Sequence, residues 1–378
     1  LIYCGFIGGD GADYGNGIAV DAAGCAYVAG TTDSHHASFP VTVGPDLIYG
    51  ATGTGGYPDA FIAKVNAAGT ALAYCGYIGG RDEDKGNAVA VDGAGCAYVT
   101  GFTTNDQSPE LYFPVLVGPD LTHNGSVDAF VTKVNAAGTG LVYSGFIGGN
   151  GSDYGHGIAV DSSGRACVAG VVYSDQATFP VLVGPGLTFN GGNCDAFAAR
   201  VGASGAGLEY CGFIGGSEQD IAYGIAVDAA GCAYVAGQTY STETSFPVAV
   251  GPDMSANGQD DAFVAKVSAT GAGLDYCGFI GGGASDQAWG IAVDTKGNAY
   301  LVGEARSSES TFPVVSGPDL THNGTFSDDA FIAKVRPGGY GLEYCGYLGG
   351  ANQDSGTGVA VDAAGNAYVT GMASYATA

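Results

Sequence analysis

The sequence predicts an all-β protein, a β-propeller of six blades with four antiparallel strands each. Three observations predict this class. Glycine makes up 69 of 378 residues beside many β-branched and aromatic residues, which is typical of strands joined by tight turns. A phrase of the form Leu-x-Tyr-Cys/Ser-Gly-Phe/Tyr-Ile/Leu-Gly-Gly recurs six times, at intervals of 66–71 residues. Each interval contains the four strands that one propeller blade requires.

The four strands of a blade can be located in the first repeat. Residues 17–21 alternate between apolar and small residues with a period of two, which predicts the first strand. The second strand, residues 26–30, returns across a turn in which Gly24 provides the positive φ that a tight hairpin needs. Residues 59–65 and 72–78 form a second hairpin and predict the third and fourth strands.

We expect residues 1–378 to form a single β-propeller domain. Its repeats start near residues 1, 72, 141, 208, 274 and 342. The last blade contains only its first two strands, within residues 358–371, and residues 1–7 would supply its fourth strand and close the ring, which removes exposed sheet edges. Three explanations of the missing third strand remain open: a three-stranded blade, a fragment of a longer repeat array, or a strand donated by a neighbouring subunit.

The charge of the chain limits its partners. There are 37 acidic and 11 basic residues, a formal net charge of −26. A polyanion repels nucleic acid and anionic lipid, whereas it attracts divalent cations and basic surfaces. No run of 18 apolar residues occurs, so no membrane span is expected.

Acidic residues gather where a propeller presents its long loops, on the face that carries the connections from second to third strand and from blade to blade. One aspartate recurs before each first strand: Asp13, Asp84, Asp153, Asp220, Asp286 and Asp354. A second begins each third strand: Asp59, Asp128, Asp195, Asp261 and Asp329. Two interpretations are open. The carboxylates cap loops by accepting backbone N–H bonds, which a strict repeat favours, or they bind Ca²⁺ together with loop carbonyls.

Other residue patterns are less specific. Asn124, Asn150 and Asn323 begin Asn-Gly-Ser/Thr sequences and are candidates for glycosylation, although Asn-Gly is also a common turn dipeptide. One basic residue recurs near the end of each third strand, and we expect it on a solvated face, paired with blade carboxylates: Lys64, Lys133, Arg200, Lys266 and Lys334. The spacing of the ten cysteines is not typical of metal ligands. We interpret most of them as small apolar residues, and disulfide bonds such as Cys4–Cys25 are the alternative.

Catalysis is not indicated. The five histidines fall at mostly unrelated repeat positions, and the sequence contains no nucleophile elbow and no phosphate-binding loop. We therefore expect no enzyme, with a glycoside hydrolase or lyase as a minor alternative, because some glycosidases use a pair of acidic residues.

The phrase Gly-Ile/Val-Ala-Val-Asp-x-x-Gly-Asn-Ala-Tyr-x-x-Gly, at residues 290–303 and 358–371, resembles the SBBP family of bacterial and archaeal β-propeller repeats. The Gly-Gly phrase, Phe-Pro and Asp-Ala-Phe recur in the order typical of that family. The cysteine at the fourth position of the Gly-Gly phrase departs from the family pattern. The resemblance implies a secreted or cell-surface protein without an assigned activity.

Together these observations favour an extracellular or cell-surface module with a structural or adhesive role, which assembles with itself into a layer, sheath or filament. The alternative is a propeller that binds carbohydrate or Ca²⁺ through its long-loop face. The expected partners are further copies of the chain or surface glycans and proteins, and neither nucleic acid nor a bilayer.

Overall fold

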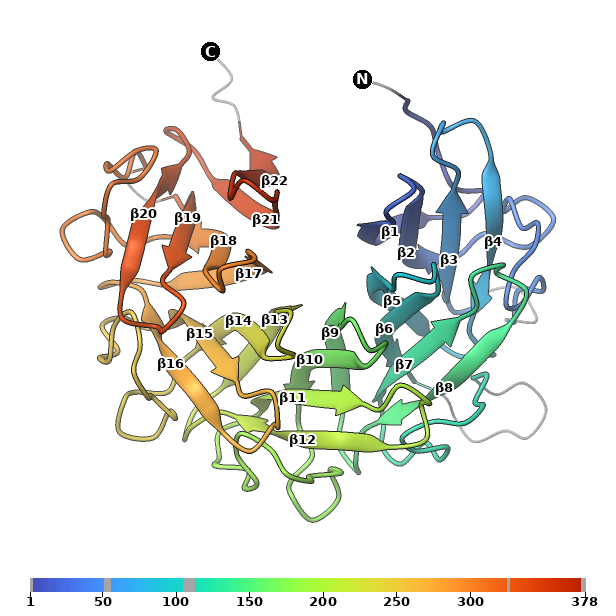
Figure 1. Ribbon diagram of the computed structural model, residues 1–378, viewed down its shortest axis with the longest axis horizontal. Helices are drawn as coiled ribbons and strands as arrows, with labels where there is room; N and C mark the ends of the chain where they lie inside the picture. Colours follow the sequence, from blue (N-terminus) through green and yellow to red (C-terminus); the bar gives the residue numbers. More distant parts are fainter. Residues whose placement is uncertain (1–2, 51–55, 105–112, 325–326, 375–378) are drawn as a thin grey trace. The chain divides into compact units, whose positions relative to one another are not determined.

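The chain folds into β-strands that alternate with turns and loops (Figure 1). The computed structural model describes residues 3–50, 56–104, 113–324 and 327–374. These residues contain 22 strands in five four-stranded antiparallel sheets and one two-stranded sheet. The predicted all-β, propeller-like fold with four-stranded blades is therefore confirmed.

The strand bounds repeat from blade to blade. The first blade contains β1 (Asp13–Val20), β2 (Ala26–Thr32), β3 (Asp59–Val65) and β4 (Leu72–Ile78). The second contains β5 (Asp84–Val91), β6 (Ala97–Thr103), β7 (Asp128–Val134) and β8 (Leu141–Ile147). The third contains β9 (Asp153–Val160), β10 (Ala166–Val172), β11 (Asp195–Val201) and β12 (Leu208–Ile214).

The remaining blades follow the same order. The fourth contains β13 (Asp220–Val227), β14 (Ala233–Thr239), β15 (Asp261–Val267) and β16 (Leu274–Ile280). The fifth contains β17 (Asp286–Val293), β18 (Ala299–Ala305), β19 (Asp329–Val335) and β20 (Leu342–Leu348). The two-stranded sheet pairs β21 (Asp354–Val361) with β22 (Ala367–Ala373).

The structure places the third and fourth strands where the sequence predicts them, and it lengthens the first two. β1 begins at Asp13, because a bulge between Gly15 and Gly17 lets its pairing with β2 continue past the Gly-rich segment. The sequence signal of alternation begins only after this bulge. The predicted first strand therefore started four residues too late.

The chain divides into two compact units. One unit contains residues 1–168, 172–180 and 200–209, and the other contains residues 169–171, 181–199 and 210–378. The boundary falls within the third blade. The predicted single domain over residues 1–378, with the ring closed by residues 1–7, concerns the arrangement of both units and stays a prediction.

Within each unit, neighbouring blades pack face to face. In the first unit β5 lies against β1, β2 and β3, and in the second β21 lies against β17, β18 and β19. The core between the first two blades combines large aromatic residues with alanine and valine, including Tyr27, Ile62, Tyr74, Val99 and Phe130. Burial of these apolar side chains is the main favourable term that holds the blades together.

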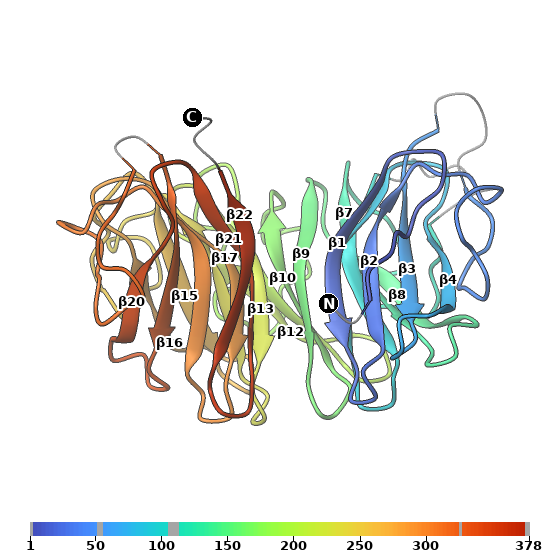
Figure 2. The same ribbon diagram turned by 90° about the horizontal axis from the view of Figure 1, so that it is seen from above.

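The two ends of each blade differ, as Figure 2 shows: tight turns join strands at one end and longer connections at the other. In the turn between the first and second strands, Asp21 Oδ1 accepts hydrogen bonds from the backbone N–H groups of Ala23 and Cys25. Gly24 adopts a φ of 84°, as its place in the turn requires. The longer connections lie at the opposite end of each blade (Figure 2).

The N-terminal segment is not the strand that the sequence predicts. Residues 3–9 form no strand, and residues 1–2 lie outside the described part of the chain. The Tyr3 ring nevertheless lies against Gly69 of the first blade, as Tyr74 lies against Gly138 of the second. The segment therefore takes the place of a preceding blade's fourth strand. Among the residues that the structure describes, no third strand pairs with it.

Two further expectations concern the membrane and the cysteines. Within the described ranges, no helix occurs that is long and apolar enough to cross a bilayer. The ten cysteines form no disulfide bond in the described chain, so the alternative bridge Cys4–Cys25 is not present. Cys75, Cys277 and Cys345 are buried, and burial raises the pKa of the Cys75 thiol to about 12. Such thiols act as small apolar side chains.

Candidate functional site

The repeated aspartates lie at the long-connection end of the blades, where two strands of neighbouring blades begin. The backbone N–H of Asp84, which opens β5, donates to the carbonyl of Pro58, which precedes Asp59 at the start of β3. The same bond joins Asp153 to Val127 and recurs at the later blades. It brings the two kinds of aspartate together in pairs, which we call the aspartate pairs: Asp59/Asp84, Asp128/Asp153, Asp195/Asp220, Asp261/Asp286 and Asp329/Asp354.

The aspartate of the first strand caps its own loop. Its Oδ2 accepts the backbone N–H of a glycine four residues earlier, for example Gly80 to Asp84 at 2.7 Å and Gly149 to Asp153 at 2.7 Å. The same bond occurs at Asp13, Asp220, Asp286 and Asp354. Asp13 begins the first strand of the first blade and has no third-strand aspartate beside it within the described residues. These contacts support the capping interpretation for all six.

Only one of the two carboxylate oxygens of the third-strand aspartate accepts a hydrogen bond. Its Oδ2 accepts one loop N–H, from Gly50 to Asp59 at 2.9 Å and from Asn124 to Asp128 at 2.8 Å. Corresponding bonds reach Asp195, Asp261 and Asp329. Its Oδ1 is buried and has no hydrogen-bond partner in all five copies. Buried polar atoms are normally paired, so five repeated exceptions indicate a shared chemical cause.

The two carboxylates of a pair flank a single glycine. A methyl group on Gly79 would lie 2.8 Å from Asp84 Oδ2 and 3.0 Å from Asp59 Oδ1. On Gly349 it would lie 2.9 Å from Asp354 Oδ2 and 3.1 Å from Asp329 Oδ1. At Gly148, Gly215 and Gly281 the nearest carboxylate is that of the third-strand aspartate, and at Gly8 it is that of Asp13. The first glycine of each Gly-Gly phrase therefore lies against at least one carboxylate that leaves no room for a side chain.

Burial raises the pKa of these carboxyl groups. It raises the pKa of Asp59 to about 8, and the neighbouring charge of Asp84 adds to the effect while the Gly50 bond opposes it. Burial likewise raises the pKa to about 7 at Asp84, Asp128, Asp195 and Asp261. Two close carboxylates in an apolar site favour a shared proton or a bound cation, because both relieve the repulsion.

The pairs do not reach a complete metal-ligand set. Among the residues that the structure describes, no group of three or more His, Cys, Asp or Glu side chains could hold a metal ion. Any cation at a pair would need backbone carbonyls or water as further ligands. The calcium interpretation therefore stays a prediction.

The glycosylation candidates lie on exposed loops, but their amides are engaged. Asn124 Nδ2 donates to Asp120 Oδ2 at 2.8 Å, and Asn323 Nδ2 donates to Asp319 Oδ2 at 3.1 Å. Asn257 makes the same bond without a Ser or Thr two residues later, which favours a turn role for this position. Asn150 Oδ1 instead accepts from Thr178. Thr325, which completes the Asn323 pattern, lies outside the described residues.

The basic residues of the third strands pair with blade carboxylates, as predicted, but the prediction of a solvated face is wrong, because their side chains are largely buried. The Lys64 side chain is only 15% exposed, lies 3.4 Å from Asp21 Oδ2 and stands over the Tyr27 ring at 4.6 Å. Lys133 repeats this arrangement with Asp92 and Tyr98. The burial of Lys64 could not be found from β3 alone, because its second-strand partner Tyr27 follows only from the register between the strands.

A second contact that the sequence did not reveal joins successive blades. The Tyr27 hydroxyl donates to Asp21 Oδ2 at 3.0 Å and lies 3.1 Å from the carbonyl oxygen of Gly95 in the next blade. Equivalent contacts join Tyr98 to Gly164, Tyr234 to Gly297 and Tyr300 to Gly365. The turn glycine, which the sequence marks only as a hairpin residue, is thus also an acceptor between blades.

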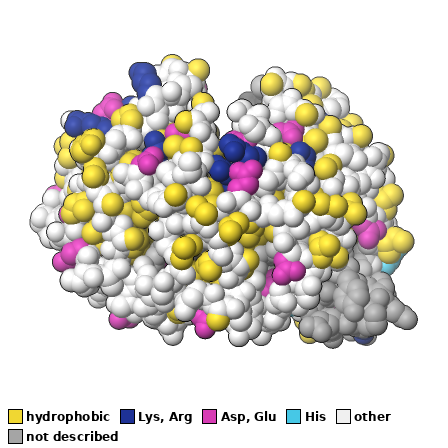
Figure 3. Space-filling view, turned by 60° about the horizontal axis from the view of Figure 1, so that its bottom comes forward, with side chains coloured by type: hydrophobic (Ala, Val, Ile, Leu, Met, Phe, Trp, Pro, Cys, Tyr) yellow, Lys and Arg dark blue, Asp and Glu magenta, His cyan; other side chains and the backbone are white. Residues whose placement is uncertain are grey.

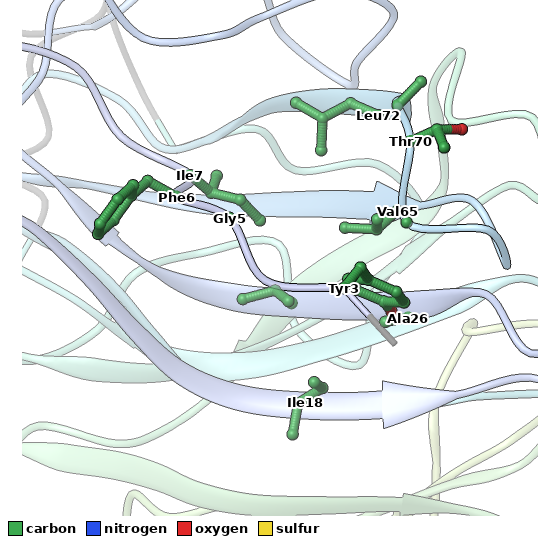
Figure 4. Close-up of a pocket in the computed structure, with 12 residues that line it drawn as sticks. Tyr3, Gly5, Phe6, Ile7, Ile18, Ala26, Val65, Thr70 and Leu72 are labelled. Atoms are coloured by element: carbon green, nitrogen blue, oxygen red, sulfur yellow. The ribbon is translucent and has the colours of Figure 1, made fainter. Parts of the chain in front are cut away.

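The first blade carries a pocket of about 300 Å³ on the face turned away from the second blade. Figure 4 shows Tyr3, Phe6 and Ile7 of the N-terminal segment beside Ile18 of β1, with Val65 of β3 close by. The lining is mainly apolar and contains no charged side chain. It suits apolar contacts better than the binding of a polar substrate.

One face of the molecule, shown in Figure 3, has no continuous charged patch among its described residues. Figure 3 presents one face, on which hydrophobic and acidic side chains are scattered among uncharged ones and several basic side chains lie beside acidic ones. This face therefore resembles neither a nucleic-acid-binding surface nor a concentrated anionic patch.

Comparison with known proteins identifies the repeat. A family model described as the SBBP β-propeller repeat matches residues 7–36, 276–308 and 344–374. No curated protein matches the chain.

Among solved structures, hydrazine synthase of Kuenenia stuttgartiensis is similar, with a TM-score of 0.49, 10% identity, and coverage of 94% of this chain and 73% of that one. A protein of unknown function from Dyadobacter fermentans has a TM-score of 0.45 and 11% identity, with coverage of 92% and 87%. A gluconolactonase of Xanthomonas campestris has a TM-score of 0.36 and 14% identity, with coverage of 76% and 68%. At these identities and scores the similarities say nothing about function.

Proposed function

Because three stretches of the chain carry SBBP β-propeller repeats, we propose that the protein is a structural or adhesive module of the cell surface or extracellular space. It associates with further copies of itself, or with surface glycans and proteins, and does not act by catalysis. Its acidic composition, with a net charge of −26, supports the extracellular or cell-surface location, because high net charge keeps a protein soluble.

The observation that carries the proposal is the pair of exposed blade faces. Ile18 of β1 is 69% exposed, whereas residues at the same blade position, Val89, Ile158 and Ile291, are at most 9% exposed. Tyr368 of β22 is 60% exposed, and its counterpart Tyr27 is fully buried. These surfaces have the composition of blade interfaces, and apolar surfaces of this kind mark association sites.

Multi-angle light scattering of the 378-residue chain tests self-association. We expect the apparent mass to rise with protein concentration and to exceed the 37.4 kDa of one chain. Tyr368→Asp should reduce the rise, because it places a charge on an apolar contact surface. A strict monomer over the whole accessible concentration range would refute the assembly role.

A second candidate function, cation binding, is favoured by the buried Oδ1 atoms without partners at the five third-strand aspartates and at Asp84. In this function the aspartate pairs hold Ca²⁺ with loop carbonyls, on the end of the blades that would also present a carbohydrate site. The measurement is thermal unfolding at pH 8 with Ca²⁺ or with EDTA. Ligand bound only to the folded state raises the unfolding temperature, so identical curves would eliminate this candidate.

A further inference from the structure

A polar pocket of about 310 Å³ lies where the first two blades meet. There β5 of the second blade packs against β1 and β2 of the first (Figure 1). The pocket is lined by Tyr14, Asn16, Thr31 and Asp33 of the first blade and by Lys85 of the second. It differs from the apolar pocket beside the N-terminal segment, because its lining carries charged and amide groups. Its volume lies at the lower end of the range for small-molecule sites.

The pairing of β1 with β2 brings the first-blade residues of the pocket together. Tyr14 pairs with Thr31 in the antiparallel register, and cross-strand partners share one face of a sheet. Asp33 directly follows the end of β2. Asn16 lies at the bulge of β1, where a strand can re-aim a side chain. The first blade thus presents an aromatic ring, a hydroxyl, an amide and a carboxylate to one small space.

Hydrogen bonds hold Asn16 between the two blades. Its Nδ2 donates to the Gly86 carbonyl of the second blade at 2.9 Å and to Thr31 Oγ1 at 3.2 Å. Because the amide nitrogen is engaged on both sides, the amide oxygen is the atom that can accept from a ligand. The Lys85 ammonium pairs with Glu83 at 2.7 Å. Groups that are already held in place lose little freedom when a ligand binds.

The next junction shows what fills this space between the second and third blades. Phe102 of β6 has the position of Thr31 in β2, and Tyr154 of β9 has the position of Lys85 in β5. The Phe102 and Tyr154 rings lie 4.9 Å apart in an edge-to-face contact. Thr31 and Lys85 carry no ring. The pocket therefore follows from the residue types at two positions of the repeat.

The junction of the fourth and fifth blades is bridged by a hydrogen bond instead. Gln287 Nε2 of the fifth blade donates to Asp260 Oδ2 of the fourth at 3.2 Å. The corresponding residues of the pocket are Lys85 and Pro58. The Pro58 side chain has no polar atom, so this bridge cannot form between the first two blades. The polar groups of the pocket are left to meet a ligand.

The lining matches the hydroxyl groups of a sugar. A hydroxyl group donates and accepts at once, and the pocket offers Lys85 as a donor beside Asp33 and the Asn16 amide oxygen as acceptors. The Tyr14 ring adds an apolar surface for the C–H groups of a sugar ring. From this arrangement we propose that the pocket binds one neutral pyranose unit of a glycan. An anionic sugar is disfavoured, because Glu83 already balances the charge of Lys85.

Saturation-transfer NMR with the 378-residue chain tests this binding. The probes are the methyl glycosides of glucose, galactose and mannose, with sodium glucuronate as the anionic comparison. At least one glycoside should bind saturably in the millimolar range, and glucuronate should bind more weakly than that glycoside. Absence of saturable binding by all three glycosides overturns the proposal, and so does tighter binding of glucuronate.

Two substitutions place the sugar in the pocket. Thr31→Phe should abolish binding, because it introduces the ring that fills the next junction. Asp33→Ala should weaken binding about tenfold, the loss expected when a hydrogen bond to a charged group is removed. Asp33 is exposed, so Asp33→Ala decides the question if thermal unfolding shows that Thr31→Phe is not folded.

Asp175→Ala is the matched control. Asp175 is exposed on the connection that follows the second strand of the third blade, and it accepts the N–H of Ala177 at 3.0 Å. Its substitution should leave the affinity unchanged. Equal affinity of the wild type and the Asp33→Ala protein, or an equal loss in the Asp175→Ala protein, overturns the assignment to this pocket.

This inference rests on the part of the proposed function in which the protein binds surface glycans, and it names the site and the class of ligand. Light scattering and a glycan array separate the two. Array binding that is equal in the wild type, Thr31→Phe and Asp33→Ala proteins would leave the adhesive function standing and refute the pocket. Glycoside binding at the pocket by a chain that neither self-associates nor binds any array glycan would refute the proposed function and leave the pocket.

Discussion

A carboxyl group that is buried with one oxygen unpaired binds a proton more tightly than a carboxyl group in water. Asp59 is fully buried, its Oδ1 has no partner, and burial raises its pKa to about 8. The folded state therefore holds a proton that the unfolded chain releases near pH 4. Stability from this group is present at low pH and declines as the pH rises from about 4 towards 8.

Asp59→Asn should stabilise the protein at pH 8. The asparagine oxygen can still accept the Gly50 N–H, and no charge is buried. We expect a gain of about 1–3 kcal/mol at pH 8, the range for an unpaired buried polar group, and little change near pH 4. Urea unfolding at pH 4 and at pH 8 measures this change in unfolding free energy.

Asp46→Asn is the control for this substitution. Asp46 is exposed and also accepts a backbone N–H, from Ile48 at 2.9 Å. Its substitution should change the unfolding free energy at pH 8 by less than about 0.5 kcal/mol, because the side chain is exposed. An Asp59→Asn protein that is less stable than wild type at pH 8 would show that the charged carboxylate is required, as cation binding demands.

Gly79→Ala tests the packing of a glycine between two carboxylates. A methyl group would lie 2.8 Å from Asp84 Oδ2 and 3.0 Å from the Asp59 carboxyl group, which is too close for either to remain in place. Overpacking of this kind costs about 1–3 kcal/mol of unfolding free energy. Gly93→Ala, where a methyl group meets no atom within 4 Å, should change it by less than about 0.5 kcal/mol. Equal effects would disprove the close approach.

At the scale of the strand, the second-strand tyrosine links one blade to the next. Tyr234 donates to Asp228 at 2.9 Å, and its hydroxyl lies 3.5 Å from the Gly297 carbonyl oxygen of the following blade. Lys266 stands over the same ring. A single side chain thus connects a turn, a third strand and a neighbouring blade.

Tyr234→Phe should destabilise the protein by about 0.5–1.5 kcal/mol, because a buried hydroxyl is removed and its acceptors lose a donor. The same change at Tyr368 should cost little, since this hydroxyl is exposed and bonds only Asp362 among the described residues. Chemical denaturation of the two variants provides the comparison. A larger loss at Tyr368 would contradict the exposed state of β22.

The strand pattern itself is readable from the sequence, because apolar alternation and turn glycines act locally. The third and fourth strands of each repeat follow this pattern, and the aspartate positions follow from their recurrence. Local signals could not place Asp13 inside β1, since the bulge after Gly15 interrupts the alternation. They also missed the burial of Lys64 and the pairing of Asp59 with Asp84, because both depend on strands that are distant in sequence.

At the scale of the whole molecule, the raised pKa values of the aspartate pairs make the same kind of contribution to the pH dependence of stability. Burial raises the pKa to between about 6 and 8 at Asp59, Asp84, Asp128, Asp195, Asp220, Asp261 and Asp286. Turn aspartates such as Asp294 have a lowered pKa: burial raises it, but the hydrogen bonds from Asn298, Lys296 and Tyr300 together lower it by more. Their stabilisation is lost only as the pH falls below about 4.

The unfolding temperature should therefore be highest near pH 5 and decline towards pH 8. Calorimetry in buffers with EDTA measures the protein without divalent cations. An unfolding temperature that rises steadily from pH 5 to pH 8 would contradict the raised pKa values. A decline that Ca²⁺ abolishes at pH 8 would favour cation binding at the pairs.

Association through the exposed face of β22 is the central claim, and hydrogen exchange at increasing protein concentration tests it most directly. We predict that the amides of residues 367–373 exchange rapidly in dilute solution and become protected as chains associate, whereas those of β14 stay protected throughout. Protection of β22 that is the same at every concentration would contradict the claim.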